Sequence, residues 1–172
     1  ASSTLYAAAL LSNLEIVQRT NHGFASDYIG LGLDATVAQG GPEFEFRNNT
    51  MYPIKVVAEY YASGGKNYLK VSLLGTKVDD TYVKIKTEVL ETIPFTEEIV
   101  ETDELAPGER KVEQTAYTGY KVKTYRNVYS GDGKLISSTF EASSNYKARN
   151  RIVLVGKSAA VTPTDPATPV DP

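Results

Sequence analysis

The single histidine of the chain, His22, is the first candidate for acid–base chemistry, because imidazole titrates near neutral pH. His22 lies in a polar loop between Arg19 and Asp34. Asp34 could orient the imidazole as a base, and Arg19 could bind an anionic substrate beside it. In the alternative interpretation, Arg19 and Asp34 form an ion pair that pins the loop to a sheet, with His22 as a hydrogen-bonding spacer. We favour the ion pair and keep Arg19, His22 and Asp34 as the catalytic candidates.

Other reactive groups are scarce. The absence of cysteine removes disulfides, thiolate metal sites and cysteine nucleophiles. Ser2, Ser3 and Thr4 have no lysine or second histidine nearby to activate them, and capping of a helix N-terminus explains them. One acidic run lacks the glycine-punctuated spacing of a calcium loop, and we expect it to form a solvated edge facing Lys and Arg of the next strand. Its members are Glu97, Glu98, Glu101, Asp103 and Glu104. We predict no metal site and no cofactor.

Charge argues against a nucleic-acid partner, and hydropathy argues against a membrane-spanning segment. The 18 Lys and Arg residues against 21 Asp and Glu give a net charge of −3, so no basic field favours nucleic acid. No apolar run is long enough to span a membrane. The hydrophobic share of 41% predicts a thin architecture rather than one large core.

The first part of the chain, residues 1–77, predicts an α+β unit. A helix over residues 4–12 is apolar on nearly every face and should therefore be buried, with Asn13 as its left-handed C-terminal residue. Alternating residues and glycine turns then predict an antiparallel sheet. Its expected strands cover residues 14–18, 34–38, 43–46, 54–61 and 68–74.

The second part, residues 78–157, alternates charged with β-branched residues and has few apolar runs. We predict an elongated, core-poor all-β domain, because too little apolar surface is available for a central core. Residues 158–172 are rich in Pro and Thr and predict an extended tail.

Residues 2–77 resemble the C-terminal part of the VanW-like family. The segments that carry this resemblance are Ser2–Tyr6, Leu14–Val17, Arg19, His22, Gly32–Val37, Phe46–Thr50 and Tyr52–Ile54. Gly23 follows His22 where the family usually has Ser. The glycine-rich Cys-Gln stretch of the family would stand just before Ala1, so we expect a fragment truncated at its N-terminus.

Residues 80–157 resemble the G-five (G5) domain of bacterial surface proteins, which is named for its five glycines. Four of these glycines correspond to Gly108, Gly119, Gly133 and Gly156, and Ala116 stands at the remaining position. We expect the four glycines to be structural, whereas Ala116 tolerates β geometry but not a positive φ. The resemblance implies an extended β arrangement with little core.

The tyrosines of the second part have two interpretations. Exposed rings beside Lys and Asn could stack on sugars and hydrogen-bond their hydroxyl groups, as glycan binding on a flat sheet requires. Alternatively, tyrosines in a core-poor sheet cover their neighbours in place of a core. The candidates for glycan binding are Tyr117, Tyr120, Tyr125 and Tyr129.

Both resemblances imply a bacterial cell-envelope protein at the cell surface, with a membrane-anchored or wall-associated parent. We expect non-catalytic binding of peptidoglycan or N-acetylglucosamine through the G5 domain, and no nucleic-acid partner. Two alternatives remain. The first part could belong to a cell-wall modifying enzyme with a site around Arg19, His22 and Asp34, or the chain could be a structural spacer in an adhesive stalk.

Overall fold

The computed structural model describes residues 1–157, and the predicted tail at 158–172 lies outside the described residues. The described residues form two compact units, one made of residues 1–95 and 117–149 and the other of residues 96–116 and 150–157. The predicted boundary at residue 77 therefore lies within the first unit. We describe each unit by itself, and the domain boundaries of the sequence analysis stay a prediction.

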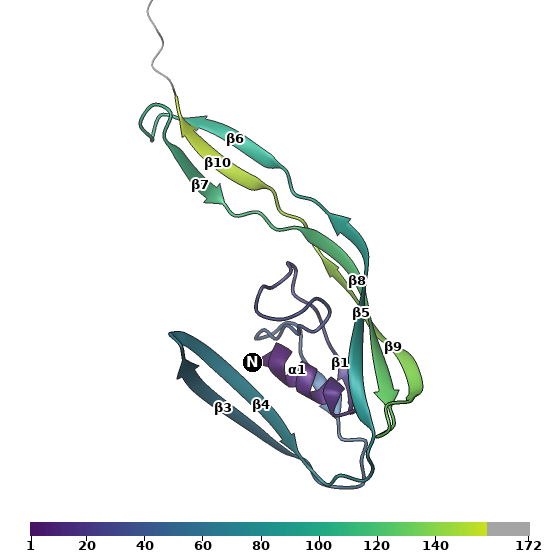
Figure 1. Cartoon of the computed structure of the whole chain (residues 1–172). Coiled ribbons are helices and arrows are strands. Elements are labelled where there is room, and N and C mark those ends of the chain that lie inside the picture. Colours follow the sequence, from purple (N-terminus) through teal and green to yellow (C-terminus); the bar gives the residue numbers. More distant parts are fainter. Residues whose placement is uncertain (158–172) are drawn as a thin grey trace, which may run out of the picture. The chain divides into compact units, whose positions relative to one another are not determined.

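One helix, α1 (Ser2–Leu11), is central to the first unit. It packs against β1 (Glu15–Gln18), β4 (Lys66–Leu74) and β5 (Tyr82–Ile93) (Figure 1). Tyr6 and Leu10 of α1 form a buried cluster with Ala35. The predicted helix is confirmed, and so is the left-handed Asn13 after it, with a φ of 56°. A helix that is apolar all round is buried on several sides because each side needs apolar cover.

Two local predictions about this region are wrong. Ser2 and Ser3 do not cap the helix, whose N-cap is Ala1 with no side-chain hydrogen bond. The Ser2 hydroxyl instead donates to the Ala35 carbonyl at 2.6 Å, and Ser3 Oγ accepts from the Ala35 amide at 3.1 Å. Residues 34–38 form no strand, because these helix hydroxyls and the carbonyl of Thr20 take the hydrogen bonds that a neighbouring strand would supply.

Antiparallel sheets make up the rest of the first unit. β1 pairs with β2 (Glu45–Arg47), and β3 (Lys55–Ser63) forms a hairpin with β4. The predicted turn of this hairpin is confirmed, with positive φ at Gly64 and Gly65. A three-stranded sheet has the order β5-β8-β9, with β8 at Gly119–Tyr129 and β9 at Leu135–Tyr146.

The second unit is a three-stranded sheet with little core. Its order is β6-β10-β7, in which β10 (Arg151–Gly156) runs parallel to β6 (Glu97–Thr102) and antiparallel to β7 (Arg110–Gln114). Among its described residues, Val153 and Gly156 are the buried ones. Glu97 contacts both Arg110 and Arg151. The fold class is therefore confirmed as an α+β region with one buried helix, followed by a core-poor all-β region.

The four glycines predicted to be structural serve two different purposes. Gly108 and Gly133 have φ values of 79° and 87°, which residues with a Cβ rarely adopt. Gly119 and Gly156 instead lie against neighbouring backbone. A Cβ added at Gly119 would lie 2.7 Å from the amide nitrogen of Ala148, and one at Gly156 would lie 1.9 Å from the carbonyl oxygen of Ala106.

Substitution of Gly119 tests this close approach. We expect Gly119→Ala to lower the free energy of unfolding by about 2 kcal/mol, because the backbone between Tyr146 and Ala148 must move away. Gly23→Ala is the matched control, since a Cβ there would meet nothing within 4 Å. Urea unfolding of both variants measures the difference, and equal stabilities would contradict the packing role of Gly119.

Candidate functional site

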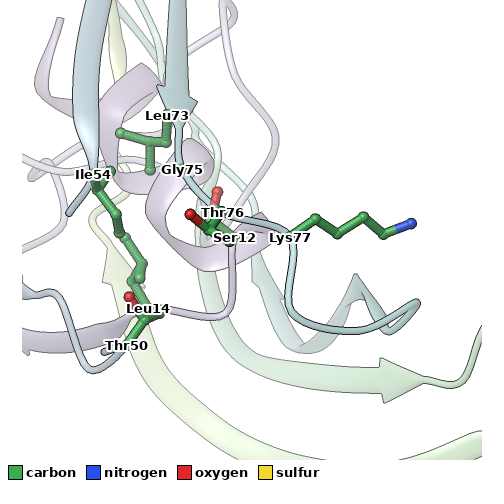
Figure 2. A pocket seen from close by; sticks show the side chains of 8 residues that line it. All are labelled: Ser12, Leu14, Thr50, Ile54, Leu73, Gly75, Thr76 and Lys77. Atoms are coloured by element: carbon green, nitrogen blue, oxygen red, sulfur yellow. The ribbon is translucent and has the colours of Figure 1, made fainter. Parts of the chain in front are cut away.

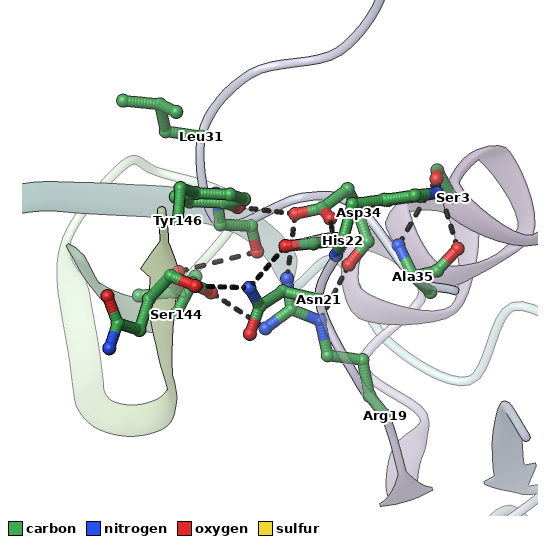
Figure 3. Close-up of polar contacts among 12 residues, drawn as sticks. Ser3, Arg19, Asn21, His22, Leu31, Asp34, Ala35, Ser144 and Tyr146 are labelled. Atoms are coloured by element: carbon green, nitrogen blue, oxygen red, sulfur yellow. Dashed lines mark hydrogen bonds and ion pairs between the residues drawn. The ribbon is translucent and has the colours of Figure 1, made fainter. Parts of the chain in front are cut away.

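The three catalytic candidates Arg19, His22 and Asp34 meet at one buried carboxylate (Figure 3). Asp34 Oδ1 lies 2.9 Å from Nη2 of Arg19, and Oδ2 lies 2.7 Å from Nδ1 of His22. The backbone amide of His22 also donates to Oδ2, at 2.6 Å. Asp34 thus binds two residues at the start of the polar loop, Arg19 and His22.

Arg19 is enclosed by protein groups on all the atoms that donate. Its Nε donates to the Asp34 carbonyl at 2.6 Å, and its Nη1 donates to the hydroxyl of Ser144 at 2.7 Å. The guanidinium also lies 5.1 Å from the ring centroid of Tyr6. Only 4% of the Arg19 side chain and 2% of the Asp34 side chain are exposed. The pair therefore has the geometry of a buried structural ion pair.

Strand β9 supplies two residues of this network that were not predicted as its members. Ser144 binds Arg19, and the buried hydroxyl of Tyr146 donates to Asp34 Oδ1 and accepts from the amide of Gly32 at 2.8 Å. Asn21 adds a bond to the carbonyl of Asn145 at 3.0 Å. No local sequence pattern indicates these partners, because they lie more than 100 residues from the loop that they bind.

The network determines the charge state of its centre. Burial alone would raise the pKa of Asp34, but hydrogen bonds from the His22 amide, Tyr146 and the His22 ring, together with the charge of Arg19, lower that pKa below its ordinary value. Burial and the bond to Asp34 raise the pKa of Tyr146, and burial raises the pKa of Tyr6 to about 12. At neutral pH an ionised Asp34 therefore faces neutral tyrosines and a cationic Arg19.

Among the three catalytic candidates, His22 is the accessible one. One third of its side chain is exposed, and because Asp34 is ionised, Nδ1 is the nitrogen that donates to it. The ring also packs edge-on against Tyr28, with centroids 6.5 Å apart. An imidazole oriented by a carboxylate can act as a base, but Arg19 and Asp34 are almost completely buried and have little surface with which to bind a substrate.

The four tyrosines proposed for glycan binding lie in three different environments. Tyr117 stacks on Phe24 with ring centroids 4.9 Å apart, and Arg149 lies over both rings. Tyr120 is on the face of β8 that also carries the buried Val122, because residues two apart on a strand share a face. Tyr125 and Tyr129 are on the opposite face of β8.

This opposite face, here called the outer face, carries a set of aromatic side chains. Tyr129 is paired with Tyr82 of β5 and the two rings stack, with centroids 5.4 Å apart and planes 13° apart. Tyr125 is paired with Phe140 of β9 and packs against it edge-on at 6.0 Å. Tyr82 and Phe140 are 38% and 53% exposed. The sequence analysis missed both, since only the strand register brings them beside Tyr129 and Tyr125.

Polar groups surround these rings. Lys84 Nζ lies 5.6 Å from the ring centroid of Tyr82 and 5.2 Å from that of Tyr129. The hydroxyl of Ser138 donates to the side-chain oxygen of Asn127 at 2.7 Å. The outer face therefore combines flat apolar ring surfaces with cationic, amide and hydroxyl groups.

Comparison with known proteins identifies both parts of the chain. Residues 1–73 match the family described as VanW like protein, and residues 84–158 match the G5 domain. The chain thus carries a segment that matches the VanW-like family, followed by a segment that matches the G5 domain. This combination is typical of bacterial cell-envelope proteins, and the predicted order of the two families is confirmed.

Individual relatives cover only parts of the chain. The uncharacterized protein YoaR of Bacillus subtilis (strain 168) is 45% identical over 60 residues, which are 35% of this chain and 20% of that protein. An IgA1 protease G5 domain structure is 28% identical, covers 46% of this chain and 94% of its own, and has a TM-score of 0.30. The crystal structure of HP0197-G5 is 27% identical over 45% and 97% of the two chains, with a TM-score of 0.24.

A pocket of about 290 Å³ lies in the first unit near the end of α1 (Figure 2). Hydroxyl groups of Ser12 and Thr76 and aliphatic groups such as Leu73 line it. Lys77 points away from it and forms an ion pair with Asp80.

Within the described residues, no cluster of three His, Asp or Glu side chains could hold a metal ion, and no helix is long and apolar enough to cross a membrane.

Removal of the Asp34 charge tests the structural role of the network. We expect Asp34→Asn to lower the free energy of unfolding by about 3–5 kcal/mol, because it leaves the buried Arg19 without a counter-charge. Glu91→Gln is the control, since it removes an exposed ion pair with Lys121 and should cost less than about 1 kcal/mol. Urea unfolding at neutral pH gives both values. Comparable losses in the two variants would argue against the network.

The lowered pKa of Asp34 also predicts how its contribution depends on pH. The unfolded chain protonates this carboxyl near its ordinary pKa of 3.8, whereas the folded chain protonates it at lower pH. The stability that the charge contributes is therefore complete above pH 3.8 and decreases as the pH falls through the folded-state pKa. We expect the stability difference between wild type and Asp34→Asn to shrink along an acid series of urea unfolding curves. A difference that grows toward low pH would have the wrong sign.

Proposed function

We propose that this cell-envelope protein binds cell-wall glycan without catalysis, through the outer face of the β5-β8-β9 sheet, here called the G5 sheet. The observation that carries the proposal is the pair of aromatic contacts there, Tyr82 with Tyr129 and Tyr125 with Phe140, on a face whose rings are partly exposed. The glycan class is peptidoglycan or another chain of N-acetylglucosamine units. Such a role places the protein at the outside of the bacterial cell.

The chemistry of the outer face suits such a ligand. The C–H faces of a pyranose ring pack on flat aromatic rings, while the hydroxyl and acetamido groups need hydrogen-bonding partners at the ring edge. Asn127 and Ser138 supply an amide and a hydroxyl next to the rings, and Lys84 supplies a cation for the carboxylates of peptidoglycan stems. A flat face buries little of its ligand, so the affinity of a single site is low. Tethering of the protein, or several sites on one glycan chain, would raise the overall avidity.

The same geometry divides the tyrosines by role. We assign glycan contact to Tyr125 and Tyr129, together with Tyr82 and Phe140. Tyr117 packs with Phe24 and Arg149, and Tyr120 is on the opposite face of β8, so both are assigned to the stability of the sheet. The two interpretations of the tyrosines in the sequence analysis thus apply to different residues.

The enzyme alternative would use the network around Asp34. The burial of Arg19 and Asp34, and the protein hydrogen bonds that both make, support a structural role for the pair instead. Of the three catalytic candidates, only His22 has substantial accessible surface. For this reason we prefer the binding role for the G5 sheet.

Retention on purified peptidoglycan tests the proposal. We expect the wild-type chain to be retained at low salt and Tyr125→Ala and Tyr129→Ala to bind roughly five- to tenfold more weakly, as loss of an aromatic contact predicts. The affinity is measured in parallel by titration with soluble N-acetylglucosamine oligomers.

A matched control is available in the hairpin. Tyr61 and Tyr68 stack at 5.3 Å with planes 16° apart, almost the same geometry as Tyr82 and Tyr129, but on β3 and β4. Tyr68→Ala should therefore leave glycan retention unchanged. No retention of folded wild-type protein at low salt, or equal loss in Tyr68→Ala, would exclude the outer face as the binding surface.

A further inference from the structure

Strand β3 has an unpaired edge. In the described part of the chain it pairs with β4 alone, so the hairpin is a two-stranded sheet. Eight of its nine residues are exposed. Two-stranded hairpins are marginally stable by themselves, and an unpaired strand edge is a template for another strand. Strand β3 therefore has the geometry to accept a partner strand.

The apolar face of the hairpin is covered on one strand only. Paired residues share a face, which places Val56 beside Leu73 and Tyr60 beside Leu69. Helix α1 packs against β4, and Leu69 and Leu73 are partly buried. On β3, Val56 is 50% exposed and Tyr60 is 70% exposed. The uncovered apolar residues thus lie along the free edge.

We propose that a second copy of this chain pairs with that edge, β3 against β3, in antiparallel orientation around a two-fold axis at Val57. Charge complementarity selects this register. It places Lys55 opposite Glu59 of the partner subunit, and by symmetry it forms the same contact a second time. Within one chain Glu59 already lies 3.2 Å from Lys70, so each Glu59 would be between two lysines.

The same register also places apolar residues opposite each other. On the other face, Val56 is opposite Ala58 of the partner subunit, and Ile54 is opposite Tyr60 of the partner subunit. A register centred on Glu59 would instead place two glutamates opposite each other, which is destabilising. Self-complementary pairing around a two-fold axis is the commonest symmetry of homodimers.

Charge reversal tests the pairing in the full 172-residue chain. Lys55→Glu and Glu59→Lys should each weaken self-association roughly tenfold or more, because each places like charges opposite each other twice. An equimolar mixture of the two variants should form a heterodimer, since every opposed pair is then of opposite sign. Lys66→Glu, beside the turn of the hairpin, is the control and should dimerise like wild type. Sedimentation equilibrium gives the association constants.

A cysteine at the two-fold axis provides a second measurement, which reports the register and traps even a weak dimer. The natural chain has no cysteine, and Val57 is the residue that meets its own copy in this register. Opposed residues of antiparallel strands have a Cα separation that a disulfide can span. We expect Val57→Cys to crosslink to a dimer under mild oxidation and Ser63→Cys, on the same face beyond the overlap, not to do so. A wild-type monomer at all concentrations, with equal or no crosslinking at the two positions, would overturn the proposal.

Discussion

The arrangement of the first compact unit depends on the burial of one ion pair, Arg19 with Asp34. Two charges removed from water cost several kcal/mol each unless their hydrogen-bonding capacity is satisfied. Here the partners come from separate parts of the chain: the loop at His22, the carbonyl of Asp34 itself, and Ser144 and Tyr146 on β9. The VanW-like segment and the β9 strand of the G5 domain must therefore lie together in one unit for this pair to be stable.

The same requirement explains what the sequence could and could not predict. Asn13 and the turn at Gly64 and Gly65 are local, since their backbone conformation follows from residue type. The meeting of Arg19 with Asp34 was predictable as an ion pair of opposite charges in nearby segments. The roles of Ser144 and Tyr146 were not predictable, because each contacts its partner only when segments more than 100 residues apart in the sequence have come together.

The serines of α1 and the tyrosines of β8 show what neighbouring residues in the sequence can and cannot predict. A serine near a helix start can cap its own helix or bind another segment with the same hydroxyl, and Ser2 binds Ala35 because that buried carbonyl has no strand partner. The four tyrosines formed one set of candidates in the sequence, and the observed strand β8 separates Tyr120 from Tyr125 and Tyr129 because successive residues point to opposite faces. Their neighbours Tyr82 and Phe140 depend on strand register, which one sequence does not determine.

The side chains proposed to bind glycan on the outer face also contact one another in the free protein. Tyrosine has only two side-chain torsions, so stacked rings such as Tyr82 and Tyr129 form a surface that loses little conformational entropy when a ligand arrives. Lys84 lies over these rings in the free protein. A sugar that stacks there must displace this cation, and the free energy of the lost cation–π contact is subtracted from the binding free energy. In the proposed binding role, the contact that stabilises the exposed rings would therefore also limit the affinity of a single site.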